Sequence, residues 1–128
     1  MLLAILAATI AGWIFGAVWY GVLGKSWAAA LGKPDIGGQV PVVPMIVSVL
    51  CEAIMATVFA ILLRHVAGEG ATILDGMATG ALLWFGFVAT ALVTNHAYAG
   101  AKRAFTLIDG GHWLGVLLIQ GAVLAALA

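Results

Sequence analysis

One carboxyl group, that of Glu52, lies in the middle of a long apolar run from Pro41 to Leu63. If this run spans a membrane, an ionised Glu52 costs about 2.5–3.5 kcal/mol on insertion scales, and such acids commonly bind protons, cations or ligands. Gln120 lies at a similar depth in another apolar run, so we expect the two side chains to meet. The alternative interpretation is structural: a neutral carboxyl group hydrogen-bonded to Gln120, or to Ser48 one turn away.

Polar and aromatic residues also gather near the ends of the apolar runs. Asp109 and His112 are three residues apart and share a helical face, so with His96 they could form a triad of metal ligands. No dense H-x-x-x-H or C-x-x-C spacing supports this, and we expect neither a metal nor a cofactor. We expect Asp109 to cap a helix N-terminus and the aromatic residues to form an interfacial belt. This end cluster comprises Trp19, Tyr20, Lys25, Trp27, Asn95, His96, Asp109 and His112.

The composition indicates an integral membrane protein. Apolar residues make up 65% of the 128 residues, charged residues make up 8%, and the formal net charge is zero. A soluble domain has about 45–50% apolar and about 25% charged residues. The composition therefore excludes a monomeric soluble enzyme, a disordered chain and a basic nucleic-acid-binding protein. The expected partner of this surface is the lipid bilayer.

Four apolar runs are long enough to cross a bilayer, which takes about 20 residues of helix. Each run must be helical because the membrane interior offers no water to its backbone groups. We predict an all-α polytopic membrane protein with one transmembrane domain, residues 1–128, and helices at about 2–23, 41–64, 73–95 and 108–127. Short connections favour an antiparallel four-helix bundle.

The distribution of basic residues predicts the orientation. The first and third loops hold Lys25, Lys33, Lys102 and Arg103, whereas the opposite side holds only Arg64 and the amino terminus. Positively charged loops stay in the cytoplasm. We therefore expect loops one and three inside and both termini outside.

Small residues at a spacing of four let helices approach closely. One such ridge runs through the first apolar run, and G-x-x-x-G pairs occur in the third and fourth. The ridge could pack within the chain or form a seam between two copies. Four short spans enclose little interior, so we expect an oligomer. The helix-packing positions are Ala8, Gly12, Gly16, Gly76, Gly80, Gly111 and Gly115.

Several short motifs occur in a specific order: Trp19-Tyr20, Gly24-Lys25-Ser26-Trp27, Trp84-Phe85-Gly86, Asn95 and Ile108-Asp109-Gly110-Gly111. Nearly the whole chain resembles a bacterial membrane family known as domain of unknown function 1761. The resemblance implies four spans in a bacterial inner membrane and no assigned activity. Two positions differ: Gly21-Val22 replaces a frequent Ser-Pro, and His112 replaces a frequent Tyr. The second difference weakens a shared role for His112.

Three functions remain open. The first is a small transporter, channel-like or ligand-binding protein that uses Glu52 together with Gln120. The alternative is an accessory or assembly subunit of a larger membrane complex, which suits a chain with little mass outside the membrane. A membrane enzyme ranks last, because the sequence lacks a nucleophile–base pair, a phosphate-binding loop and a cofactor fingerprint.

Overall fold

The computed structural model describes residues 1–127, which are mostly helical and contain no strand. The first two long helices are α1 (Leu2–Leu31) and α2 (Val42–Ala67), joined by a 3₁₀ turn at Pro34–Ile36. Four helical segments are long and apolar enough to cross a membrane, which confirms the predicted class of all-α membrane protein. The remaining elements are α3 (Ile73–Leu83), the π-helix η2 (Trp84–Ala89), α4 (Thr90–Tyr98) and α5 (Arg103–Leu127). Because α3, η2 and α4 are continuous, together they form a single helical segment, Ile73–Tyr98, which we call the third span.

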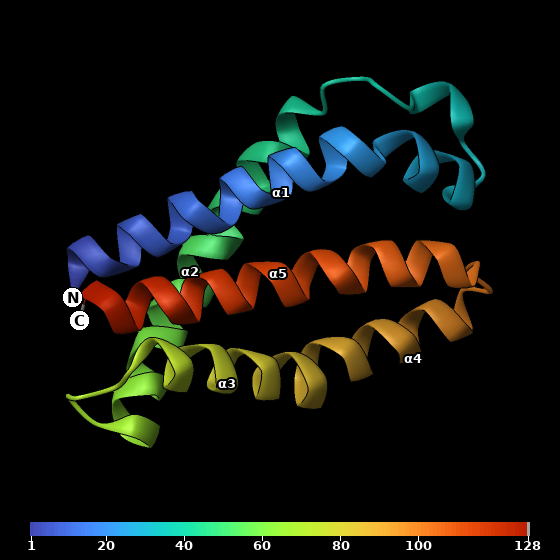
Figure 1. The fold of residues 1–128 in the computed structure, drawn as a ribbon. Helices are drawn as coiled ribbons and strands as arrows, with labels where there is room; N and C mark the ends of the chain where they lie inside the picture. Colours follow the sequence, from blue (N-terminus) through green and yellow to red (C-terminus); the bar gives the residue numbers. More distant parts are fainter. Residues whose placement is uncertain (128) are drawn as a thin grey trace.

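The last helix, α5, lies at the centre of the fold. In Figure 1, α1, α5 and the third span lie side by side as a layer, with α5 in the middle. Along this layer α1 and the third span run from left to right, and α5 returns, so that both ends of the chain lie at the left. Helix α2 crosses behind the layer at a steep angle and packs mainly against α1.

Two helices begin or end outside the limits expected from the sequence. The first helix does not end near residue 23 but continues to Leu31, and Gly32 ends it in a left-handed conformation with φ of 86°. Ala28, Ala29 and Ala30 favour helix over the expected surface loop. The last helix begins at Arg103 rather than near residue 108. Asp109 therefore lies inside α5 and caps no helix end.

Glycines allow α3 and α5 to touch backbone to backbone. A Cβ atom at Gly76 would lie 2.0 Å from the main-chain oxygen of Gly121, and one at Gly80 would lie 2.5 Å from that of Leu117. Neither position accepts a side chain without moving a helix. Close contact of this kind is the expected use of small residues between membrane helices.

Small and large residues alternate between α1 and α5. On α1, Gly12 and Gly16 make room for side chains of α5, and on α5, Gly115 and Gly111 make room for the rings of Phe15 and Trp19. The ridge that includes Ala8 is therefore buried against α5 within one chain. It is not available as a seam between two copies.

A capping box begins the third span. The Thr72 hydroxyl accepts a hydrogen bond from the main-chain N–H of Asp75, and the Asp75 carboxylate accepts one from the main-chain N–H of Thr72. This reciprocal pair satisfies free donors at the start of the helix.

Candidate functional site

Glu52 and Gln120 meet where α2 crosses α5. Both side chains are buried, with 1% of Glu52 and 0% of Gln120 exposed. The side-chain amide of Gln120 donates a hydrogen bond of 3.2 Å to the main-chain carbonyl oxygen of Glu52. The expected meeting therefore occurs, but through the backbone of Glu52 rather than its carboxyl group.

The polar atoms of this pair are incompletely hydrogen-bonded. Within residues 1–127, Oε2 of Glu52 and Oε1 of Gln120 are both buried without a partner. Ser48 does not bond to the Glu52 carboxyl, because its hydroxyl donates to Met45 O at 2.8 Å and accepts from Trp13 Nε1 at 3.2 Å. A buried acceptor without a donor costs about 1–3 kcal/mol. Of the two hydrogen bonds expected for a purely structural carboxyl group, neither is formed.

Asp109 joins α1 to α5. Its Oδ1 atom accepts hydrogen bonds from the Tyr20 hydroxyl at 2.6 Å and from the Trp27 indole N–H at 3.0 Å. At the residue before Asp109, the main-chain oxygen of Ile108 accepts a hydrogen bond of 3.0 Å from the indole N–H of Trp19. Of these donors, only Trp27 lies in the part of α1 that extends beyond the expected helix end near residue 23. The extension of α1 is therefore what brings Trp27 to Asp109.

His112 lies one turn after Asp109 on α5 and packs against the rings of Phe15, Tyr20 and Trp113. It is 6% exposed, and its ring centroid lies 4.9 Å from that of Tyr20 and 4.6 Å from that of Trp113. Gly16 makes room for it, since a Cβ atom there would lie 2.8 Å from Nε2. The other ring nitrogen, Nδ1, is buried without a hydrogen-bond partner in the described part of the chain.

The polar residues of α5 lie along the interface with α1 in two layers. Asp109 and His112 form one layer, and Gln120 with Glu52 forms the other. Between the two layers, Val116 is fully buried. It packs against Gly12, where an added Cβ atom would lie 3.3 Å from Val116 Cγ1. One apolar side chain thus separates a polar layer near the helix start from a polar layer at mid-helix.

A family model described as "Protein of unknown function (DUF1761)" matches residues 3–125. The chain belongs to this family. The resemblance inferred from the short motifs is therefore confirmed. No curated protein and no solved structure matches the chain. Membership assigns no activity, so the functional argument depends on the side chains themselves.

In this family member, His96 lies apart from the expected metal triad. Its Nδ1 atom lies 2.9 Å from Thr106 Oγ1, and its ring packs on Phe105 with centroids 4.9 Å apart. Phe105 in turn packs on Trp27 at 5.7 Å and so connects His96 to the end cluster. Residues 1–127 contain no group of three His, Cys, Asp or Glu side chains placed to hold a metal ion.

Two members of the expected end cluster take no part in the hydrogen-bond network that the structure describes. Lys25 and Asn95 are both exposed, and neither side chain forms a hydrogen bond within the described residues. The cluster that the structure brings together therefore consists of Trp19, Tyr20, Trp27, Asp109 and His112, with His96 at its edge.

Trp84 is not among the residues expected in the end cluster, yet it bonds to α5 from the side opposite α1. Its indole N–H donates to Gly110 O at 2.8 Å, just as Trp19 donates to Ile108 O. Two tryptophans from the two neighbours of α5 thus bond to carbonyls two residues apart. A sequence signal existed, because Trp84-Phe85-Gly86 repeats the pattern of Trp19-Tyr20-Gly21.

Proposed function

We propose that this protein is a small membrane transporter or channel-like protein that binds a proton at Glu52. The observation that carries the proposal is the buried carboxyl oxygen of Glu52, which has no partner and lies beside Gln120, whose Oε1 also lacks one. A carboxyl group that only stabilised the fold would be expected to satisfy its oxygens. A proton on Glu52 creates a donor, and Gln120 Oε1 is an unfilled acceptor on the neighbouring residue.

The packing favours a proton over a larger solute. Two apolar grooves are described on the outside of the fold, and neither is lined by Glu52 or Gln120. A solute or hydrated ion would need an open cavity at the site. A proton needs only donors and acceptors, with a bound water between them where the distance requires it.

The second polar layer supplies titratable groups between Glu52 and one end of the helices. Tyr20, Asp109 and His112 lie on the same α1–α5 interface as Gln120. A proton would pass from this layer to the Glu52 layer across Val116. Val116 would then act as the barrier that keeps the protein from leaking protons.

The proposal includes the orientation of the protein in the membrane. We define the basic end as the end that carries Lys25, Lys33, Lys102 and Arg103, and the opposite end carries Arg64 with Glu69 and Asp75. Because positive loops stay in the cytoplasm, the basic end would face the cytoplasm of a bacterial cell and both termini would lie outside.

The test is a proton flux measurement on purified protein in liposomes that contain a pH-sensitive dye. We expect the protein to dissipate an imposed pH gradient faster than protein-free liposomes do, and Glu52→Gln to abolish the difference. The matched control is Glu69→Gln, which removes an exposed acid outside the helices and should leave the flux unchanged. Equal flux with and without protein, or an unchanged flux for Glu52→Gln, would refute the proposal.

A second measurement does not depend on flux. Infrared spectroscopy of the protein in lipid should show the stretching band of a protonated carboxyl group, which Glu52→Gln removes and Glu69→Gln retains. Circular dichroism on each variant separates a lost site from a lost fold. If no carboxyl band were lost in Glu52→Gln at any pH, that would also count against proton binding at Glu52.

One observation favours the alternative of an accessory or assembly subunit. The third span buries only 11% of its most apolar window within the chain, and Phe85 and Phe87 are 70% and 74% exposed. This face would suit lipid, another membrane protein or a second copy of the chain. Gentle extraction of the protein together with the membrane around it tests this role. A second protein that stays bound would support the role, and recovery of this protein alone would refute it.

A further inference from the structure

We propose that an anionic phospholipid binds in the groove between α1 and α2, with one acyl chain along the groove and its phosphate at Lys25 and Lys33. The proposal does not depend on proton binding at Glu52. The groove has a volume of about 310 Å³. It is lined by Trp13, Val40, Val42, Met45, Ile46 and Val49.

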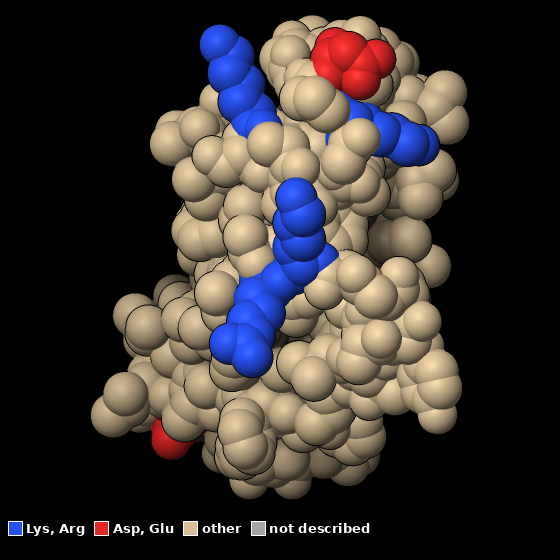
Figure 2. Space-filling view, turned by 90° about the vertical axis from the view of Figure 1, so that its right-hand side faces the viewer, with Lys and Arg blue, Asp and Glu red and all other residues tan. Residues whose placement is uncertain are grey.

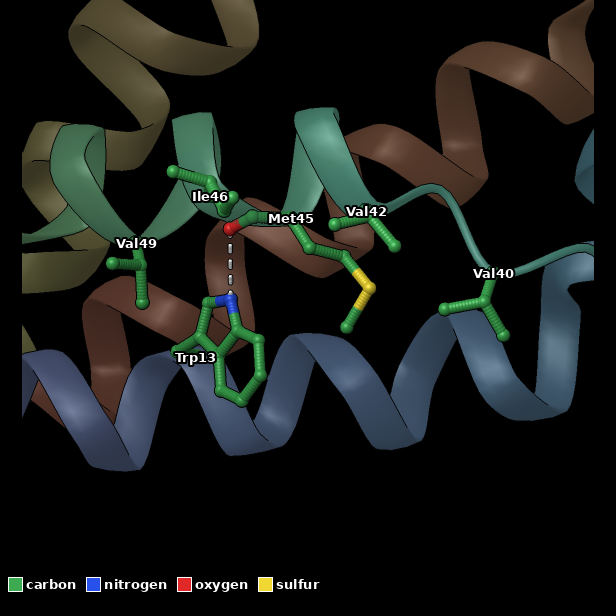
Figure 3. Close-up of a pocket in the computed structure, with 6 residues that line it drawn as sticks. All are labelled: Trp13, Val40, Val42, Met45, Ile46 and Val49. Carbon is green, nitrogen blue, oxygen red and sulfur yellow. Dashed lines mark hydrogen bonds between the residues drawn. The ribbon is translucent and has the colours of Figure 1, made fainter.

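The lining of the groove suits an acyl chain. The lining atoms are almost entirely apolar. The one side-chain polar group, the indole N–H of Trp13, is already engaged by Met45 O at 3.2 Å and by Ser48 Oγ at 3.2 Å. Figure 3 shows this hydrogen bond to Met45, with Val40 and Val42 on one side of the indole and Val49 on the other. No donor or acceptor is left for a polar solute.

The groove leads towards the basic end. Gly37 packs on α1 at Lys25, since a Cβ atom there would lie 3.3 Å from Lys25 Cα. Val40 lines the groove only three residues later, and three residues reach at most about 11 Å even when extended. The mouth of the groove and Lys25 are therefore close enough for one lipid molecule to touch both.

The depth of the groove matches one leaflet of a bilayer. Trp13 lies twelve residues before Lys25 on the same helix, which is about 18 Å along α1 at about 1.5 Å per residue. Half of the hydrocarbon core of a bilayer is about 15 Å thick. A phospholipid with its phosphate at the level of Lys25 would thus place the end of its acyl chain near Trp13.

Charge decides which phospholipid would bind. The four cations of the basic end lie in or beside the α1–α2 and α4–α5 connections, which contain one acid, Asp35. Figure 2 looks onto this end and shows Lys and Arg side chains gathered across it. Basic residues beside a gap between membrane helices favour anionic headgroups. A zwitterionic lipid would find the same groove but no net attraction at its mouth.

The experiment uses the whole protein in nanodiscs of phosphatidylglycerol and phosphatidylcholine in equal amounts. Native mass spectrometry after release into mild detergent should show retained phosphatidylglycerol in preference to phosphatidylcholine. Lys25→Ala with Lys33→Ala should reduce this preference by about tenfold. The matched control is Lys102→Ala with Arg103→Ala, which removes the same charge where α4 connects to α5 and should change the preference far less.

A second arm tests the groove itself. Lipids brominated near the end of the acyl chain should quench tryptophan fluorescence, and the quenching by bound lipid should fall in Trp13→Phe but not in Trp113→Phe. Ile46→Trp fills the groove and should abolish lipid retention, whereas Val47→Trp, on an exposed neighbour that does not line it, should retain the lipid.

Three outcomes would overturn the proposal. The first is equal retention of the two lipids by the unchanged protein. The second is equal loss of lipid in the two double-alanine variants, which would mean that charge acts without the groove. The third is lipid retention by Ile46→Trp, and a cross-link between two copies of Val49→Cys would then show that a second chain occupies the groove.

Discussion

The main-chain oxygens of Gly76 and Gly121 each occupy the space where the other residue would carry a side chain. A Cβ atom at Gly76 would lie 2.0 Å from Gly121 O, and a Cβ atom at Gly121 would lie 2.1 Å from Gly76 O. The helices α3 and α5 are therefore in direct backbone contact at this point. Any side chain at either residue must push them apart.

We expect Gly76→Ala to destabilise the protein by about 2 kcal/mol or more, because it forces overpacking at a rigid contact. The measurement is unfolding of the protein in mild detergent by a denaturing detergent, followed by circular dichroism. Gly21→Ala is the matched control: it lies in helix α1 with open space around it and should be neutral or slightly stabilising. Equal stability of the two variants would contradict the backbone contact.

Tyr20→Phe removes the hydroxyl that donates to Asp109 Oδ1 at 2.6 Å. Hydrogen bonds to charged groups contribute about 1.5–3 kcal/mol, and Trp27 keeps one donor on the same oxygen, so we expect a loss near the lower limit. The same unfolding measurement applies. Tyr98→Phe removes an equivalent hydroxyl from a residue that is 92% exposed, and it should have no effect.

Gly16→Ala should displace the imidazole of His112. The added Cβ atom would lie 2.8 Å from Nε2, and the contact is with a side chain rather than backbone. We therefore expect a moderate loss of stability that is largely relieved in a His112→Ala background. A double-mutant cycle on the two residues measures this coupling. If the two losses simply add, then Gly16 does not serve to accommodate His112.

Val116→Thr places a hydroxyl between the two polar layers at nearly constant side-chain volume. If Val116 is the barrier to proton movement, this variant should raise proton flux in liposomes above that of the unchanged protein. Val123→Thr is a control on the same helix, outside the α1–α5 polar layers. A flux equal to that of the unchanged protein would remove Val116 from the proposed path.

The sequence was sufficient to predict the class of fold and the meeting of Glu52 with Gln120. Length and hydropathy determine where helices can cross a membrane, and equal depth on two helices predicts which side chains can approach. The partner atoms were not predictable in this way. Whether Gln120 donates to the carboxyl or to the main chain of Glu52 depends on how steeply α2 crosses α5, which no local pattern encodes.

The end cluster was predicted only in part for a related reason. Charges at Lys25 and Lys102 suggested loops, but alanines continue α1 to Leu31 and α5 begins at Arg103. The longer α1 carries Trp27 to Asp109, whereas Lys25 on α1 and Asn95 on α4 are exposed. Trp84 was missed because an aromatic residue in a membrane helix is usually taken as part of an interfacial belt rather than as a hydrogen-bond donor to a helix carbonyl.

Because α5 lies at the centre of the fold but comes last in the chain, the helices cannot assemble in the order in which they are synthesised. Helices α1, α2 and the third span precede α5 in the chain, yet α1 and α3 make their closest contacts with α5 and not with each other. The helix contacts that Gly12, Gly16, Gly76 and Gly80 make with α5 can therefore form only after the fourth helix has been synthesised. The last helix to be made is thus the one that completes the packing of helices made before it.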